Sequence, residues 1–251
     1  MKREKNSRRQ REKSQATSQP KSWQCLLKQY WQWAIIWEIP RKSVHASIGI
    51  LTLHLYVRHL ETSAVTPYLI AALVPAAGCD IIRFAVPEFN RIYVAVLGPL
   101  MRESEINGWN GVIFYLIGAW TVLIIFPKDI AVISILVLAW SDTAASTFGR
   151  LYGGRGPLLR HGKSLIGSIA ACCMAMFSVY LFWGYIARFD EPGLSWHPSS
   201  RLNIHSLALV TGIIGAFAEQ FNLCGLNDNC VIPILTGSLL YLFLKGIQHY
   251  T

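Results

Sequence analysis

The chain has 251 residues, of which 53% are hydrophobic and only 15% are charged, and its mean hydropathy is +0.35. These values are too apolar for an ordinary soluble domain, and they exclude an acidic disordered chain. The net charge is +9, and eleven of the 23 lysines and arginines lie in the first 42 residues. A basic head on an apolar body indicates an integral membrane protein rather than a nucleic-acid-binding domain, so we expect no nucleic-acid partner. The six cysteines form no CxxC pair and are interpreted as packing residues.

The first 39 residues divide into two segments. Residues 1–22 are mostly Lys, Arg, Gln, Ser and Glu, a composition that cannot bury enough apolar surface to fold. We therefore predict a disordered, basic cytosolic tail and expect it to contact anionic lipid. In residues 23–39, apolar and aromatic side chains recur at steps of three and four residues, while Lys28 and Glu38 interrupt the run. This pattern predicts an amphipathic helix that lies in the membrane interface.

Seven windows in residues 40–251 are apolar enough to span a membrane, which takes roughly 20 residues. With a cytosolic N-terminus, alternating spans place the loops 87–107, 149–163 and 222–230 on the inner face, where basic residues collect. We therefore predict an all-α fold, a polytopic integral membrane helical bundle with about seven spanning helices. The windows are 44–60, 65–86, 108–126, 130–148, 164–187, 204–221 and 231–247.

Arg41 and Lys42 lie directly before the first window and are followed by Ser43. One interpretation is a positively charged membrane anchor in which Ser43 caps the helix. The other is that two adjacent cations at a helix N-terminus bind a polyphosphate, because the side chains and the helix dipole attract the same anion. The residues alone leave both interpretations open.

The fourth window contains Asp142 and leads into a run of small residues and arginines. On a helix, Asp142 shares one face with Gly149 and Gly153. Small residues alone indicate close helix packing, but a carboxylate in an apolar helix is costly and is a functional candidate by default. Because Arg155 follows, the pattern is typical of a carboxylate that holds a divalent metal beside backbone and arginine donors to phosphate.

Two more segments bring polar groups to the same membrane face. Lys163 precedes Ser164, which can cap the fifth helix, so the pair predicts an anion site at a helix N-terminus. It is not a P-loop, because proline stands where that motif needs its first glycine. Asn227 and Asp228 begin the seventh window, and Glu219 ends the sixth. Asn and Asp are ordinary caps, but these oxygens also suit a magnesium site or the orientation of a hydroxyl nucleophile.

Asp80 and Arg83 are one helical turn apart at the inner end of the second window. We expect them to form an intramembrane ion pair that steadies the site. Cations, helix N-termini and metal-ligand oxygens on one face suit a nucleoside triphosphate, and the apolar surroundings suit a lipid acceptor. A transporter is the rival class, but its polar residues should lie at mid-membrane depth and on both faces.

Five stretches of the chain resemble the CTP-dependent diacylglycerol kinases of fungi, within the wider group of polyprenol, dolichol and phytol kinases. They follow in order over most of residues 39–233. CDP-diacylglycerol synthases are similar in the cytidine-nucleotide region, but their closing signature is absent. The stretches are IPRKSVHASIG, CDIIRF with EFNRIYVAVLGPLMRESE, SDTAASTFGRLYG, GKSLIGSIA and AEQFNLCGLNDNCVIP.

The resemblance implies that residues 40–251 form a kinase domain in the endoplasmic reticulum and nuclear membranes. Its reaction would transfer the γ-phosphoryl group of CTP to diacylglycerol, giving phosphatidate and CDP, with dolichol or another polyprenol as the alternative acceptor. A phosphatidate cytidylyltransferase-like enzyme and a transporter are the more distant alternatives.

Carried over by position, the resemblance points first to Arg41, Lys42, Asp142 and Gly149. Phosphoryl transfer needs charge neutralisation and alignment, so we predict Arg41 and Lys42 on the phosphates. Asp142 would hold Mg²⁺ or Ca²⁺ or the acceptor hydroxyl, and Asp228 would be a second metal ligand or the base. The predicted nucleotide-binding residues are Gly149, Gly153, Arg155, Lys163, Ser164 and Asn227.

Overall fold

The computed structural model describes residues 23–159, 162–221 and 225–249. The predicted disorder of residues 1–22 lies outside this range. Contacts divide the chain after Ile39 into two units. The first unit contains the helix α2 (Trp23–Ile36), and Glu38 behind it has a left-handed backbone (φ 55°). A helix is therefore present in the predicted interfacial segment, and its place at the membrane surface stays a prediction.

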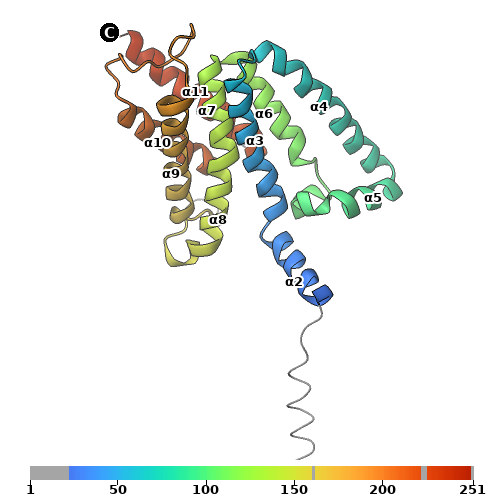
Figure 1. Ribbon diagram of the computed structural model, residues 1–251. Coiled ribbons are helices and arrows are strands. Elements are labelled where there is room, and N and C mark those ends of the chain that lie inside the picture. The colour runs from blue at the N-terminus through green and yellow to red at the C-terminus, as the bar shows by residue number, and fades with distance from the viewer. Residues whose placement is uncertain (1–22, 160–161, 222–224, 250–251) are drawn as a thin grey trace, which may run out of the picture. The chain divides into compact units, whose positions relative to one another are not determined.

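The second unit is built from helices and turns, and its described residues contain only one isolated β-bridge, between Leu158 and Ser164. All seven predicted windows form helices, and the fourth combines α7 and α8 (Figure 1). The helices are α3 (Ile39–Val57), α4 (Thr62–Ala85), α5 (Pro87–Leu97), α6 (Gly111–Ile125), α7 (Lys128–Leu136), α8 (Asp142–Tyr152), α9 (Leu165–Leu181), α10 (Ile204–Gln220) and α11 (Asp228–His249).

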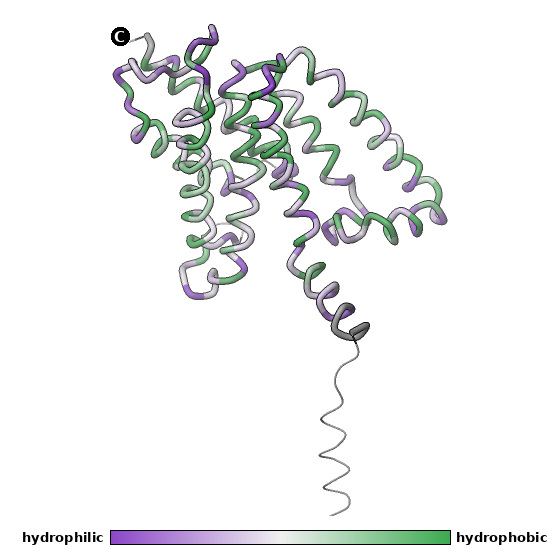
Figure 2. Tube along the Cα trace, viewed as in Figure 1, coloured by the Kyte–Doolittle hydropathy of each residue, from purple (hydrophilic) through white to green (hydrophobic). Residues whose placement is uncertain are grey.

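Four helical stretches in the described residues are long and apolar enough to cross a membrane. The helices α6 and α10 are apolar but shorter. In Figure 2, apolar residues extend along much of α4 and α6, and polar residues gather where the chain turns between α8 and α9. The predicted all-α membrane bundle is confirmed. Four of the seven predicted spans have the length and composition of a spanning helix: Thr62–Ala85, Lys128–Arg155, Leu165–Ile186 and Asp228–Ile247.

The centre of the bundle is the continuous helical stretch from α7 to α8. Of its membrane window 78% is buried, against 6% for α4, which stands at the edge of the bundle (Figure 1). Side chains such as Ile130, Ile133 and Leu136 are fully buried and contribute the largest part of the core. The helices α6, α9 and α11 pack against α7, so α8 continues from a rigid, buried support.

The segment 87–97 corrects one expectation. It was predicted as part of an inner loop but forms α5, whose described side chains include none that is buried. Pro87 occupies the first turn, where its fixed φ suits a helix and its missing N–H costs nothing. Ile92 and Val96 lie one turn apart and are 64% and 69% exposed. The helix is therefore amphipathic, and its apolar residues face outward.

The predicted pair of Asp80 and Arg83 is confirmed, and it fixes the loop before α6. Arg83 Nε donates to Asp80 Oδ1 over 2.7 Å, and both side chains are fully buried. The guanidinium also donates to the carbonyls of Glu105 and Ile106, while Asp80 Oδ2 accepts from the amide of Asn110 over 2.6 Å. Because each charge is paired and hydrogen-bonded, the pair is tolerated in an apolar setting.

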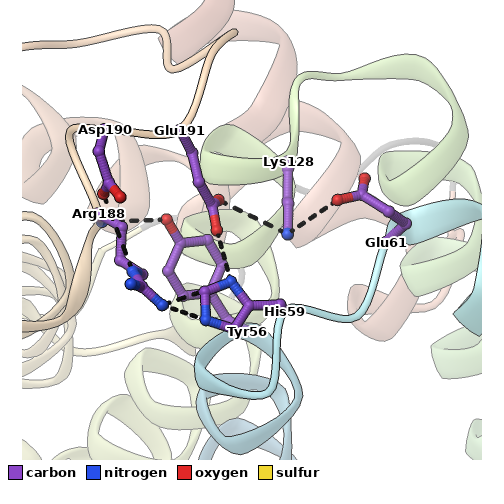
Figure 3. A network of polar contacts seen from close by, with 7 residues as sticks. All are labelled: Tyr56, His59, Glu61, Lys128, Arg188, Asp190 and Glu191. Carbon is purple, nitrogen blue, oxygen red and sulfur yellow. Dashed lines mark hydrogen bonds and ion pairs between the residues drawn. The ribbon is translucent and has the colours of Figure 1, made fainter.

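A second polar network lies at the other end of α4, where α3 ends and α7 begins (Figure 3). Lys128 Nζ lies 3.5 Å from Glu61 Oε1 and 3.7 Å from Glu191 Oε2, and 5.1 Å from the centre of the Tyr56 ring. Glu191 Oε1 also contacts His59 Nδ1 at 3.1 Å. These contacts tie the end of α3 to the starts of α4 and α7.

Candidate active site

A cavity of about 360 Å³ lies where α8 and α10 end and α9 and α11 begin. The three loops predicted on the inner face all contribute to it, with Arg102, Lys163 and Asp228. Apolar helices surround its polar floor, so charges there are less screened than in water. The other lining residues are Asp142, Ala145, Ser146, Gly149, Arg150, Gly153, Gly154, Leu158, Gly162, Ser164, Gly167, Ser168, Glu219 and Gln220.

Asp142 lines this cavity and directly follows an irregular turn in the central helix. Residues Val137–Ser141 form a π-helical turn, called η3, and α8 begins at Asp142 directly after it. Such wide turns are rare in proteins as a whole, but those that occur often lie at functional sites. They change which side chains share one face of the helix. Asp142 is 5% exposed and lines the cavity together with Gly149 and Gly153, as the helical spacing predicted, and with Ser146.

Lys163 lies between two carboxylates. Its Nζ donates to Glu219 Oε1 over 3.2 Å and to Asp228 Oδ2 over 3.5 Å, and it also contacts the Glu219 carbonyl. Burial lowers the pKa of Lys163, but the nearby charges of Glu219, Asp228 and Asp142 outweigh burial and raise it overall. The lysine is therefore a fixed positive charge at neutral pH.

The carboxylates of Asp142, Glu219 and Asp228 face the same cavity. Glu219 Oε2 is buried and accepts no hydrogen bond from the residues that the structure describes. Among those residues no three His, Cys, Asp or Glu side chains lie close enough together to enclose a metal. Mg²⁺ is usually held by one or two carboxylates and by substrate phosphates rather than by a protein cage. The donors thus fit a cation shared with a phosphate chain.

The N-terminus of α9 opens into the cavity. Ser164 caps this helix by accepting a hydrogen bond from the amide of Gly167 over 3.1 Å, which confirms the predicted cap. The first-turn amides and Lys163 therefore place two positive groups side by side, an arrangement that binds phosphate.

Glycines allow α8 to approach this helix start. A Cβ atom at Gly149 would lie 3.2 Å from Ser164 Oγ, and one at Gly153 would lie 2.9 Å from both Cβ and Oγ of that serine. The cap thus occupies the space that side chains would take. Both glycines have the packing role that was the alternative interpretation of their spacing, and their predicted part in nucleotide binding stays a prediction.

We expect Gly153→Ala to destabilise the protein by about 1–3 kcal/mol, because the new methyl group must displace Ser164 from its capping position. Thermal unfolding in detergent would measure the loss, and turnover should fall with it. Gly154→Ala is the matched control, since a Cβ there meets no atom within 4 Å. Equal unfolding temperatures for the two variants would contradict the close packing described here.

Arg41 and Lys42 do not line this cavity. The helix α3 begins at Ile39, so both cations lie in its first turn, and Ser43 follows them inside the helix instead of capping it as predicted. Lys42 Nζ donates to Thr147 Oγ1 on α8 over 3.1 Å. Arg41 is 6% exposed and lines a different cavity, between α3 and α6. Their predicted contact with phosphates stays a prediction.

Two other predicted residues also lie outside the cavity. Arg155 is exposed, and its guanidinium lies 5.5 Å from the centre of the Tyr152 ring. Asn227 has the capping role that was its alternative interpretation, because its Oδ1 accepts from the amide of Asn229 over 3.0 Å. The predicted residues that share the cavity are Asp142, Gly149, Gly153, Lys163, Ser164, Glu219 and Asp228.

The lining also includes residues that were not predicted, among them Gln220, Ser168 and Arg102. Gln220 Nε2 donates to Ser168 Oγ over 2.6 Å, and both side chains face the cavity. Ser168 follows the cap by one helical turn, and Gln220 follows Glu219, so their spacing was a usable signal. Arg102 belongs to no recognisable motif, and only the fold of its loop brings it to the site.

The fold and the cavity define a class: an all-α membrane protein with a cavity lined by charged side chains at one end of its bundle. The chain is 46% identical over 213 residues to the CTP-dependent diacylglycerol kinase 1 of Schizosaccharomyces pombe, covering 85% of this chain and 96% of that protein. It is 39% identical over 217 residues to the proteins of the same name from Eremothecium gossypii and Saccharomyces cerevisiae, covering 84% of this chain and 68% and 75% of theirs.

The chain therefore belongs to the family of CTP-dependent diacylglycerol kinases, which are lipid kinases, and the resemblance found in its sequence is confirmed. No family model matches the chain. No solved structure matches it significantly.

Proposed function

We propose that this protein transfers the γ-phosphoryl group of CTP to the free hydroxyl of diacylglycerol, giving phosphatidate and CDP. The observation that carries the proposal is the cavity in which Lys163, the start of α9 and three carboxylates meet. The names of the relatives supply the two substrates. Dolichol as acceptor has no observation of its own in its favour and is an outcome of the test below.

The phosphate chain of CTP would bind at the start of α9. Its amides and Lys163 are the donors, and Gly149 and Gly153 let α8 pack closely against the Ser164 cap of this helix. On binding, Lys163 would exchange its contacts with Glu219 and Asp228 for phosphate oxygens. The freed carboxylates would then be available to a cation or a proton.

Asp142 and Glu219 would hold a divalent cation, and Asp228 would be a second ligand or the base for the acceptor hydroxyl. When bound, such a cation neutralises charge on the transferred group. Asp142 is supported by the buried turn η3, so its carboxylate is fixed before the substrates arrive. A carboxylate already in position to hold the cation lowers the barrier, because it need not reorganise during the reaction.

The cellular setting is part of the proposal. We place the protein in the endoplasmic reticulum and nuclear membranes, with its N-terminus and the cavity on the cytosolic side, where CTP is available. The lysines and arginines of residues 1–22 would contact anionic lipid. Each would contribute about 1 kcal/mol of binding free energy near the membrane surface. The helix α2 would lie in the headgroup layer, because its aromatic residues suit that position.

Purified protein in mixed micelles with γ-labelled CTP and diacylglycerol tests the proposal. We expect labelled phosphatidate with CTP and little with ATP. Dolichol should replace diacylglycerol poorly at equal mole fraction. A protein that phosphorylates dolichol and leaves diacylglycerol unlabelled would contradict the proposed acceptor, and transfer of label from ATP alone would contradict the proposed donor.

Chelation tests the cation. We expect EDTA to abolish the formation of labelled phosphatidate and added Mg²⁺ to restore it. Without a cation, the negative charges of the cavity carboxylates and of the polyphosphate repel one another. The unfolding temperature without CTP should not change with EDTA, which would show that the metal acts in the reaction and not in the fold. Full activity after exhaustive chelation would contradict the role given to Asp142 and Glu219.

A further inference from the structure

Two further cavities lie next to one another along α3. The first, about 260 Å³, is lined almost entirely by apolar side chains from α3, α4, α6 and α7. The second, about 150 Å³, lies toward the start of α3 and includes polar residues. Ile48, Tyr115 and Leu116 line both. The two cavities are therefore direct neighbours that share these side chains, and we call them together the α3–α6 groove, with an apolar and a polar part.

The polar part contains buried groups that lack partners. Asn229 is 2% exposed and Tyr115 is 6% exposed. Among the residues that the structure describes, neither Asn229 Oδ1 nor the Tyr115 hydroxyl has a hydrogen-bond partner. Leaving such groups unpaired is costly, so they point to a ligand that supplies a donor and an acceptor.

The polar part also adjoins the candidate active-site cavity, in which we propose that CTP binds and which we call the nucleotide cavity. Consecutive residues at the start of α11 face the two spaces: Asp228 lines the nucleotide cavity and Asn229 lines the groove. Before α6, Arg102 lines the first space and Glu105 the second, and the Arg102 amide donates to Glu105 Oε2 over 3.3 Å. A ligand in the groove would thus have its polar end beside the bound phosphates.

The apolar part closes at the network shown in Figure 3. Lys128 and Tyr56 line that end, and Lys128 is tied to Glu61 and Glu191. From Arg41 to Leu55, α3 rises about 21 Å at 1.5 Å per residue. One leaflet of the hydrocarbon core is about 15 Å thick. The groove is thus long enough for one acyl chain and a small head.

We propose that the α3–α6 groove binds the diacylglycerol acceptor, with an acyl chain in the apolar part and the free hydroxyl beside Asn229. This rests on the proposed function and adds the place of the lipid. Asn229 Oδ1 would accept from the lipid hydroxyl, and the Tyr115 hydroxyl would donate to an ester carbonyl.

The small size of the polar part favours diacylglycerol over a phospholipid. The buried carboxylate of Glu105, 4% exposed, and the buried guanidinium of Arg41, 6% exposed, both line the polar part, so its lining holds one charge of each sign and suits an uncharged head better than a phosphate. The ligand is therefore a neutral lipid with a hydroxyl.

A matched pair of substitutions on α3 tests the groove. Ile48 lines both of its parts, whereas Ile50 is 64% exposed and lines neither. We expect Ile48→Trp to raise the KM for dioleoylglycerol by about tenfold and to leave the KM for CTP unchanged, because the indole fills the space for the chain. Ile50→Trp should leave both constants unchanged. Equal KM values for dioleoylglycerol in the two variants would overturn the proposal.

A second measurement does not depend on turnover. A diacylglycerol with a diazirine near the end of one acyl chain is cross-linked to the wild-type protein without CTP, and the labelled peptides are identified by mass spectrometry. We expect the label on α3 and α6 near Leu55 and Leu123, displaced by dioleoylglycerol but not by phosphatidylcholine.

The cross-linking results separate the two proposals. If the label falls mainly on the outer grooves around Phe148 and Phe177, or if phosphatidylcholine displaces it equally, the groove is not the acceptor site. If the label falls in the groove but CTP yields no phosphatidate, the proposed reaction fails while the lipid site stands. We expect Ile48→Trp to abolish this labelling as well. The unfolding temperature of the variant then distinguishes a filled groove from a protein that folds poorly.

Discussion

Asp142→Asn should lower kcat for phosphatidate formation by about 10³-fold, because the substitution removes a buried, preorganised carboxylate that is proposed to hold the divalent cation. The amide has nearly the same shape as the carboxylate. It relieves the cost of a buried charge, so the variant should insert and fold normally. Initial rates with labelled CTP at saturating concentrations of both substrates would measure the change.

Asp190→Asn is the control for this experiment. Asp190 lies at the opposite end of the bundle, in the network of Figure 3, and its side chain is 76% exposed. It loses the same charge far from the cavity, so we expect unchanged kinetics. An Asp142→Asn protein that is folded and retains wild-type turnover would rule out a role for this carboxylate in the chemical step.

Lys163→Met should raise the KM for CTP by about 10- to 150-fold, from the loss of a charge-assisted hydrogen bond worth about 1.5–3 kcal/mol. Two effects act in the same direction. The phosphates lose a donor, and Glu219 and Asp228 lose the cation that lies between them. The uncompensated carboxylates then repel the nucleotide. The KM for diacylglycerol should change little, because the lipid is placed elsewhere.

Two comparisons sharpen the Lys163 experiment. Lys245→Met removes a lysine that is exposed near the end of α11 and should leave both KM values unchanged. Lys163→Arg keeps the charge and should therefore recover part of the affinity for CTP. The recovery should be incomplete, because the longer, planar guanidinium fits the space between two carboxylates differently from an ammonium group. An unchanged KM for CTP in Lys163→Met would mean that this lysine only pairs with Glu219 and Asp228.

The helices were predictable because membrane spans carry a strong signal. An apolar run of about 20 residues has few alternatives in a chain of this composition. The helix α5 was missed because its 11 residues are too short for such a run. Its Pro87 and Glu88, in the first turn, are ordinary helix-start signals that a search for spans passes over. The π-helical turn before Asp142 has no local sequence signature that could have predicted it.

The candidate site was predictable where one helix face or one cap carried it. Asp142, Gly149 and Gly153 share a face, and Ser164 is a cap, so local geometry places them. Arg41 depends instead on how α3 packs against α6, which no spacing within α3 reveals. Glu219 and Gln220 came into the cavity through the packing of α10 against α9 and α11.

The first turn of α11 has a consequence for how this family can diversify. Asp228 and Asn229 are neighbours on one rigid helix start, and they face different cavities. A backbone shift that accommodates a new lipid head at Asn229 also moves Asp228 relative to the carboxylates and Lys163. Selection for a new acceptor is therefore coupled to the affinity for the nucleotide, and substitutions that change one preference need compensation in the other.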